Sequence, residues 1–140
     1  DIAKSMLEMC AATGSKVLLA CSSTSRHATE DLDQIARDLR KLAMLAIPYG
    51  IRIAYEGLSW GRTVNEFTTA WDVIQRADCP NLGIGIDSYH LFAAQTPLDA
   101  IDELQPDIRR KRALCPQHGD KSLEHRVLSQ RLGRDHAAET

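Results

Sequence analysis

The sequence lacks a long apolar run, a CxxC pair and a strong net charge. No apolar run approaches the ~20 residues that a membrane-spanning helix needs, so we expect no membrane contact. The four cysteines are widely separated and no secretory signal peptide is recognisable, which favours reduced thiols and a cytoplasmic protein. A formal net charge of −2 argues against a general nucleic-acid surface, because such a surface needs a concentrated basic face.

The length and composition allow one folded domain. The chain has 140 residues, of which 44% are hydrophobic, an ordinary share for a soluble globular protein. A closed eight-stranded α/β barrel typically needs ~250 residues, so only part of such a barrel would fit. The chain opens on Asp1 rather than Met, and its first ten residues already have a helical pattern. We therefore expect a fragment of a longer gene product.

Three short apolar runs recur at a regular interval. KVLLAC is centred near Leu19, IRIAY near Ile53 and LGIGI near Gly85, with spacings of 34 and 32 residues. A unit of strand, loop, helix and return loop takes roughly 30 residues or more. The runs therefore predict three consecutive βα units of a parallel α/β fold.

Apolar residues at helical spacing lie before and between these runs. The predicted stripes are Ile2, Met6, Met9 and Cys10, then Leu32, Ile35, Ala36, Leu39, Leu42 and Ala43, then Phe67, Ala70, Trp71 and Ile74. The expected helix stops are residues 13–15, Pro48 with Gly50, and residues 77–80. After Asp87 we expect a loop, SYHLFAAQTPL, with Pro97 as the first residue of a short helix through Leu104.

The repeat breaks after position 107. Residues 109–112 are all basic, whereas a buried parallel strand would be nearly continuous Val, Ile and Leu. Residues 108–140 carry eight Lys or Arg against four acids, and Leu123, Val127, Leu128 and Leu132 could form one more helix. We predict a partial barrel over 1–107 and an atypical basic tail, irregular or helical, over 108–140. The CxxH of Cys115 and His118 matches no strong zinc pattern.

Two acidic residues end neighbouring strands. Glu56 follows IRIAY, and Asp87 follows LGIGI 31 positions later. The carboxyl ends of parallel strands face the ligand, and adjacent strands lie about 4.8 Å apart. Two carboxylates this close raise each other's pKa unless a charge neutralises them, and Mg²⁺ or Mn²⁺ does so with oxygen ligands. The open alternative is that one acid caps a helix and the other lies on the surface.

The alternation of side chains along the strands adds detail to this metal hypothesis. If Glu56 points into the barrel mouth, Ile53 and Tyr55 point outward against helices, as do Ile84 and Ile86 of the next strand. Gly83 and Gly85 then face inward with Asp87. Glycine there leaves room for a ligand or for a close backbone, and it can equally mark a bulge.

Three further residues are candidates for the same site. His90 lies in the expected loop three residues after Asp87, where it could act as a general base or a metal ligand. His27, in the loop after the first strand, lies at the same mouth with a weaker case. Arg62, with Trp60 nearby, could bind a substrate carboxylate in bidentate fashion. The alternatives are a surface histidine and a solvent-exposed arginine.

The segments SSTSRHATEDLDQIARDLRKLA, IRIAYEGLSWGRTVN and LGIGIDSYHLFA resemble bacterial 3-dehydroshikimate dehydratases, within the xylose-isomerase-like sugar phosphate isomerase/epimerase barrel family. AYE-x-L-x-WGR and D-S-x-H are the specific pieces, and D-x-x-H alone would fit the whole superfamily. The resemblance covers residues 1–107. It implies part of a (β/α)8 TIM barrel with one divalent metal, such as Mg²⁺, Mn²⁺ or Co²⁺.

The resemblance also implies roles for single residues. Glu56 matches the first of four metal ligands and Asp87 the second, while the other two belong to strands expected after position 107, where this chain departs from the pattern. His90 matches a histidine at the substrate, a candidate base. The implied reaction converts 3-dehydroshikimate to protocatechuate, and Arg62 would suit the substrate carboxylate. We expect the chain alone to be inactive.

Two other functions stay open. An isomerase or epimerase of the same barrel family would also begin by removing a proton next to a sugar carbonyl. A noncatalytic α/β domain could instead use its basic tail to bind a partner or nucleic acid. The expected partner is otherwise a small molecule, and a homo-oligomer is compatible with the sequence.

Overall fold

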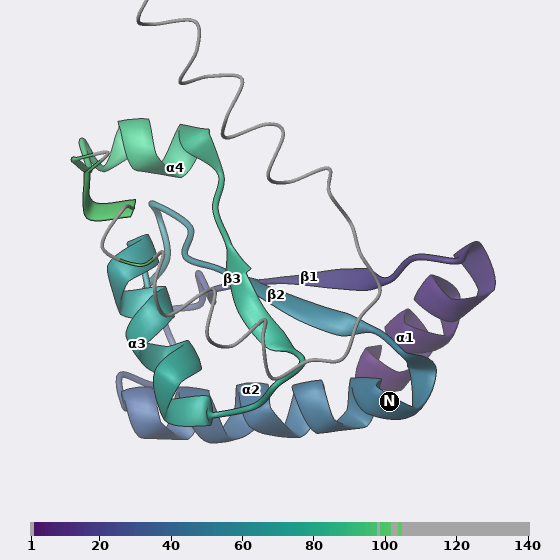
Figure 1. Cartoon of the computed structure of the whole chain (residues 1–140). Coiled ribbons are helices and arrows are strands. Elements are labelled where there is room, and N and C mark those ends of the chain that lie inside the picture. The colour runs from purple at the N-terminus through teal and green to yellow at the C-terminus, as the bar shows by residue number, and fades with distance from the viewer. Residues whose placement is uncertain (1, 98, 102–103, 105–140) are drawn as a thin grey trace, which may run out of the picture.

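The structure, a computed structural model, describes residues 2–97, 99–101 and 104. Strands and helices alternate along the chain, as predicted (Figure 1). The strands are β1 (Val17–Cys21), β2 (Arg52–Glu56) and β3 (Leu82–Gly85); the helices are α1 (Ile2–Thr13), α2 (Leu32–Ala46), the short 3-10 helix η1 (Ile47–Tyr49), α3 (Phe67–Ala77) and α4 (Ser88–Ala93). No helix among these residues is long and apolar enough to span a membrane.

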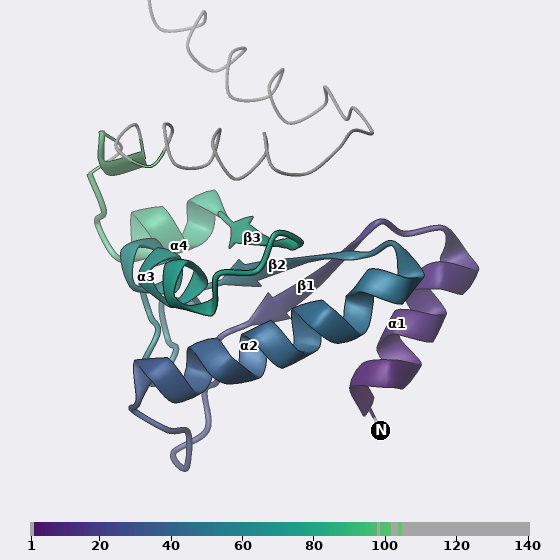
Figure 2. The ribbon, with the colours of Figure 1, turned by 60° about the horizontal axis from the view of Figure 1, so that its bottom comes forward.

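The strands form one parallel sheet in the order β1-β2-β3. In the register, Glu56 at the end of β2 lies opposite Cys21 of β1 and Gly85 of β3. Helices α2 and α3 pack against each other and against one face of the sheet (Figure 2). The three predicted βα units are therefore confirmed.

The core lies between the sheet and these two helices. Ile53 and Tyr55 of β2 are buried there, and Ile84 of β3 packs against them from the rim of the core. On the opposite face Leu19 of β1 keeps 51% of its surface exposed. The predicted alternation is confirmed within β2 and β3, whereas Ile86, beyond the end of β3, is 40% exposed.

Asn81 joins three elements just before β3. Its side-chain Nδ2 donates to the backbone oxygen of Ala43 in α2 (2.6 Å) and to that of Ile51 before β2 (3.2 Å). Its own backbone oxygen accepts from the N–H of Ile53 (2.8 Å). These bonds fix the height at which β3 begins beside β2.

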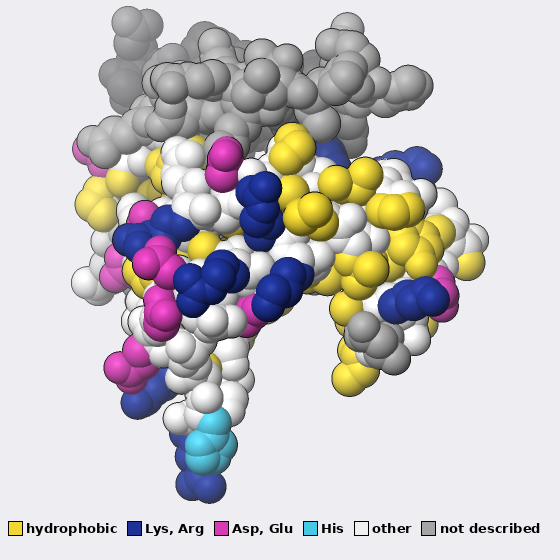
Figure 3. Space-filling view, turned by 90° about the horizontal axis from the view of Figure 1, so that it is seen from below, with side chains coloured by type: hydrophobic (Ala, Val, Ile, Leu, Met, Phe, Trp, Pro, Cys, Tyr) yellow, Lys and Arg dark blue, Asp and Glu magenta, His cyan; other side chains and the backbone are white. Residues whose placement is uncertain are grey.

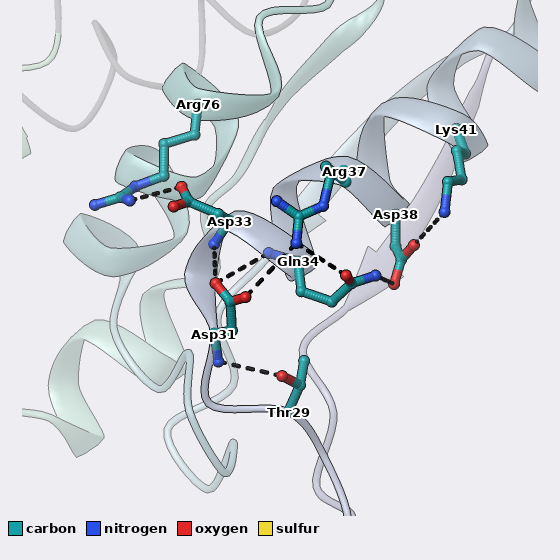
Figure 4. A network of polar contacts seen from close by, with 8 residues as sticks. All are labelled: Thr29, Asp31, Asp33, Gln34, Arg37, Asp38, Lys41 and Arg76. Atoms are coloured by element: carbon teal, nitrogen blue, oxygen red, sulfur yellow. Dashed lines mark hydrogen bonds and ion pairs between the residues drawn. The ribbon is translucent and has the colours of Figure 1, made fainter.

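A polar seam connects α2 and α3 outside their apolar contact (Figure 4). Arg76 of α3 pairs with Asp72 on its own helix (3.0 Å) and with Asp33 of α2 (2.8 Å). The Arg76 guanidinium holds the pKa of Asp33 below its usual value. Asp31 caps α2 by accepting from the N–H groups of Asp33 and Gln34. A single exposed ion pair adds little to the free energy of unfolding. The contacts of Arg76 therefore mainly set how α2 and α3 lie relative to each other.

One side of the molecule carries exposed apolar side chains (Figure 3). They gather over α1 and the adjoining end of α2, whereas charged side chains lie over the rest of α2 and over α3. The stripe expected on α1 is mostly outside the core: Leu7 is the buried residue of this helix, and the exposed apolar residues include Ile2, Met6, Met9, Met44 and Ile47.

The predicted helix stops are confirmed at two glycines. Helix α1 ends at Thr13, and Gly14 follows with a φ of +75°. After α2 and η1, Gly50 has a φ of +64°. Residues with side chains rarely adopt this left-handed conformation, so glycine suits both turns.

The prediction of a loop directly after Asp87 is wrong. Helix α4 begins at Ser88, because the Asp87 carboxylate caps it by accepting from the N–H of Tyr89 (2.8 Å). Six residues are too few to show a clear apolar period, and Leu91 is the residue that α4 buries.

The helix expected from Pro97 begins later, since helical conformation starts at Ala100. The tail over 108–140 lies outside the described residues, and its boundary stays a prediction.

Gly61, in the loop between β2 and α3, has no room for a side chain. A Cβ there would collide with the backbone oxygens of Val64 and Leu58 and with the hydroxyl of Ser22. We expect Gly61→Ala to lower the free energy of unfolding by about 2 kcal/mol, as overpacking against backbone does. Gly83→Ala is the matched control, because nothing lies within 4 Å of its added Cβ. Urea unfolding of both variants measures the difference, and equal stabilities would contradict the expectation.

Candidate metal centre

Glu56, Asp87 and His90 come together at the carboxyl end of the sheet. Each offers one ligand atom, and these atoms lie within 4.8 Å of one another. Glu56 is buried, His90 is half-buried and Asp87 is exposed. The sequence predicted this meeting from the spacing of the strands.

Glu56 ends β2 with its side chain on the face opposite the core. A Cβ at Gly85 would lie 3.5 Å from the Cβ of Glu56 and 3.1 Å from Leu19 Cδ1, so glycine keeps this place open. Glu56 is 8% exposed, which excludes the alternative of a simple surface acid.

Cys21 adds a contact that sequence reasoning missed. Its thiol donates to Glu56 Oε2 at 3.4 Å. Desolvation at the end of the sheet, together with the Glu56 carboxylate, raises the pKa of the Cys21 thiol, so the thiol stays protonated and can donate. The signal was present, because Cys21 ends β1 at the same register as Glu56.

Asp87 has two functions at once. Its Oδ1 accepts from the backbone N–H of Tyr89 and caps α4. The alternative reading of one acid as a helix cap is therefore correct for Asp87, although this does not remove it from the cluster. A carboxylate has two oxygens with several acceptor sites, so Oδ2 is left for another partner.

His90 lies in α4, where its ring contacts residues of the β2–α3 loop. Nδ1 lies 3.1 Å from the backbone nitrogen of Ser59 and 3.2 Å from its Oγ. Trp60 meets the ring edge-on at a centroid distance of 4.9 Å, and Tyr89 does so at 5.4 Å. Ser59 was not predicted, because no pattern along the chain pairs a loop serine with a histidine 31 residues later.

Arg62 and His27 have other partners. Arg62 forms an ion pair with Glu30 at 3.5 Å, and its side chain is 53% exposed. His27 is exposed, and its Nε2 lies 3.1 Å from Nε of Arg26. Within the described part of the chain, the cluster of metal-ligand groups includes neither His27 nor Arg62.

The donor set fits a divalent cation. Two carboxylates within 4.8 Å of each other concentrate two negative charges, and a cation offsets their repulsion. Oxygen donors suit Mg²⁺ and Mn²⁺, and a neighbouring imidazole also suits Zn²⁺ or Co²⁺. Glu56 and Asp87 would hold the ion, with Cys21 supporting the Glu56 carboxylate.

Two curated relatives are enzymes. The chain is 44% identical over 80 residues to a 3-dehydroshikimate dehydratase of Pseudomonas aeruginosa, an alignment that covers 57% of this chain and 13% of the relative. It is 28% identical over 104 residues to the inosose isomerase of Bacillus subtilis, which covers 71% of this chain and 37% of the isomerase. The chain thus spans well under half the length of these relatives.

Solved structures and a family profile agree with these relatives. A xylose isomerase-like TIM barrel/4-hydroxyphenylpyruvate dioxygenase fusion protein superposes with a TM-score of 0.64 at 36% identity, over 66% of this chain and 15% of that one. The IolI protein with a bound zinc atom superposes with a TM-score of 0.63 at 27% identity, over 73% of this chain and 38% of that one. The profile of the xylose isomerase-like TIM barrel matches residues 1–135. The chain therefore belongs to the xylose isomerase-like TIM barrel family and contains part of that barrel.

Proposed function

We propose that this chain is part of a divalent-metal-dependent lyase that converts 3-dehydroshikimate to protocatechuate. The observation that carries the proposal is the meeting of Glu56, Asp87 and His90 within 4.8 Å at the carboxyl end of the sheet. The similarity to a 3-dehydroshikimate dehydratase supports this substrate. The zinc atom in the related IolI structure supports a metal in this barrel family.

The reaction removes one water molecule from the substrate ring. A proton leaves the carbon next to the ketone, a ring hydroxyl departs with a proton as water, and the ring becomes aromatic. A bound divalent cation supplies Lewis-acid polarisation of the ketone oxygen. Glu56 and Asp87 would hold that cation, while His90 contacts the reacting part of the substrate.

Arg62 would bind the substrate carboxylate. Its present partner, Glu30, has a side chain that is 76% exposed, and exposed ion pairs contribute little stability. Exchanging Glu30 for a substrate carboxylate therefore costs little. The guanidinium would then form the two parallel hydrogen bonds that carboxylates favour.

An isomerase or epimerase is the second candidate function. The similarity to inosose isomerase favours it. An isomerase or epimerase would also begin by removing a proton next to a carbonyl. The substrate carboxylate separates the two proposals, because a neutral ketose would give Arg62 no such partner.

Replacing either acidic ligand should weaken metal binding. We expect Glu56→Gln and Asp87→Asn each to reduce the Mn²⁺ affinity of the chain at least ~10-fold, because each loses a charged oxygen ligand. Glu8→Gln is the matched control, since Glu8 lies on α1 and pairs with Lys4. Calorimetric titration measures the affinities. Mn²⁺ binding that neither substitution changes would refute the metal site.

Arg62→Ala should separate the two substrates. In the Mn²⁺-loaded chain we expect it to weaken 3-dehydroshikimate binding at least ~10-fold, because hydrogen bonds to charged groups are worth about 1.5–3 kcal/mol. Arg37→Ala is the control, with a side chain of similar exposure that pairs with Asp31. Tight binding of a neutral ketose, unchanged in Arg62→Ala, would favour the isomerase instead.

The chain by itself should not turn over. Two of the family's four ligand positions are matched among the described residues, and a strand edge without its neighbour leaves unpaired backbone groups. We expect the chain to form no protocatechuate from 3-dehydroshikimate when Mn²⁺ is present. The ultraviolet absorbance of protocatechuate measures its formation. Conversion that EDTA abolishes would show that the chain holds a complete centre.

A further inference from the structure

Ser59 makes two contacts to one nitrogen of His90. Its backbone nitrogen lies 3.1 Å from His90 Nδ1, and its hydroxyl oxygen lies 3.2 Å from the same atom. Ser59 belongs to the β2–α3 loop and His90 to α4, so the contacts connect two consecutive βα units of the barrel. Nothing in the chemistry proposed above uses Ser59.

The backbone contact determines which nitrogen of the ring carries the proton. A hydroxyl either donates or accepts, so Oγ of Ser59 leaves the question open. A backbone N–H only donates, and therefore His90 Nδ1 accepts with its lone pair. A neutral imidazole has one N–H, which must then be on Nε2.

The surroundings hold the ring in this orientation. Trp60 meets it at an interplanar angle of 69° and Tyr89 at 85°, the edge-to-face geometry that aromatic rings favour. The start of α4 is fixed in turn by the carboxylate of Asp87, which caps the helix through Tyr89. The aromatic neighbours hold the plane of the ring, and turning the ring over within that plane would break the contacts to Ser59.

We propose that Ser59 is a positioning residue that fixes His90 as the Nε2–H tautomer, so that the ring nitrogen left free by Ser59 is a hydrogen-bond donor and not a proton acceptor. The donor would suit a ligand oxygen on which negative charge develops, such as the oxygen of an enolate. This role rests on the proposed function, whereas the tautomer itself does not. His90 would then not be the base that was expected from the sequence.

Nitrogen NMR on the full chain tests the tautomer directly. In chain labelled with ¹⁵N-histidine at about pH 8, where ordinary histidines are neutral, we expect His90 to show an unprotonated Nδ1 and a protonated Nε2. His90→Gln identifies the signal by its loss. His27 is the internal reference of the opposite kind, because Arg26 Nε–H donates to its Nε2 and the proton of that ring should lie on Nδ1. A protonated Nδ1 on His90 like that of His27, or a signal averaged between the two tautomers, would overturn the proposal.

Substitutions at both partners separate positioning from general stability. Ser59→Ala keeps the backbone N–H and should keep the tautomer, whereas Ser59→Pro lacks that N–H and should show a mixture. If the proline variant fails to fold, the rate of hydrogen exchange at the Ser59 amide tests the bond from that N–H to His90 Nδ1 instead. We expect exchange about tenfold faster in His90→Ala, and rescue in His90→Asn, whose Oδ1 can accept in place of Nδ1. Equal exchange in these two variants would contradict the contact.

Adding Zn²⁺ distinguishes this inference from the metal proposal. If Zn²⁺ shifts the signals around Glu56 and Asp87 while His90 keeps its Nε2 proton, both proposals stand. If Zn²⁺ causes no change and the tautomer is as expected, the metal proposal fails and the role of Ser59 stands. If His90 loses its Nε2 proton to the metal, His90 is a ligand and the donor role is wrong.

Discussion

The arrangement of the site depends on the bonds that Asn81 makes before the third strand. Its amide joins the end of α2 to the start of β2, and its backbone oxygen pairs with β2 directly. The Cys79 thiol donates to its Oδ1 and fixes which end of the amide faces those carbonyls. A slip of one residue would turn every side chain of β3 to the other face. The register that results puts Gly85 beside Glu56 and brings Asp87 just beyond it.

This register brings the groups of the candidate metal centre together at one end of the sheet. The backbone hydrogen bonds of the sheet hold the carboxylates of Glu56 and Asp87 close together despite their mutual repulsion. Gly85 leaves the space beside Glu56 free. The helices contribute by burying the other face, where Ile53 and Tyr55 fill the core. The core and the candidate metal centre thus lie on opposite faces of the same strands.

The strands, three of the helices and the cluster itself could be predicted from the sequence, because each follows from a local period or from the spacing of strand ends. Glu56 and Asp87 are visible in this way, as last residues of apolar runs one βα unit apart. The prediction missed helix α4, because six residues are too few to show a helical period of apolar residues. The role of Ser59 could not be predicted, because its contact with His90 depends on how the β2–α3 loop lies against α4. The tail and the boundary near position 107 lie outside the described residues.

The shared use of the Asp87 carboxylate links helix order to ligand occupancy. One oxygen caps α4 and the other is free for a cation, so any ligand that redistributes charge on this group also changes the strength of the cap. Thermodynamic linkage makes the effect reciprocal, and fraying of the first turn of α4 would weaken the hold on the ligand by the same free energy. His90 and Tyr89 are part of that turn. Order in the first turn of α4 and the binding of a ligand at Asp87 are therefore coupled through one carboxylate.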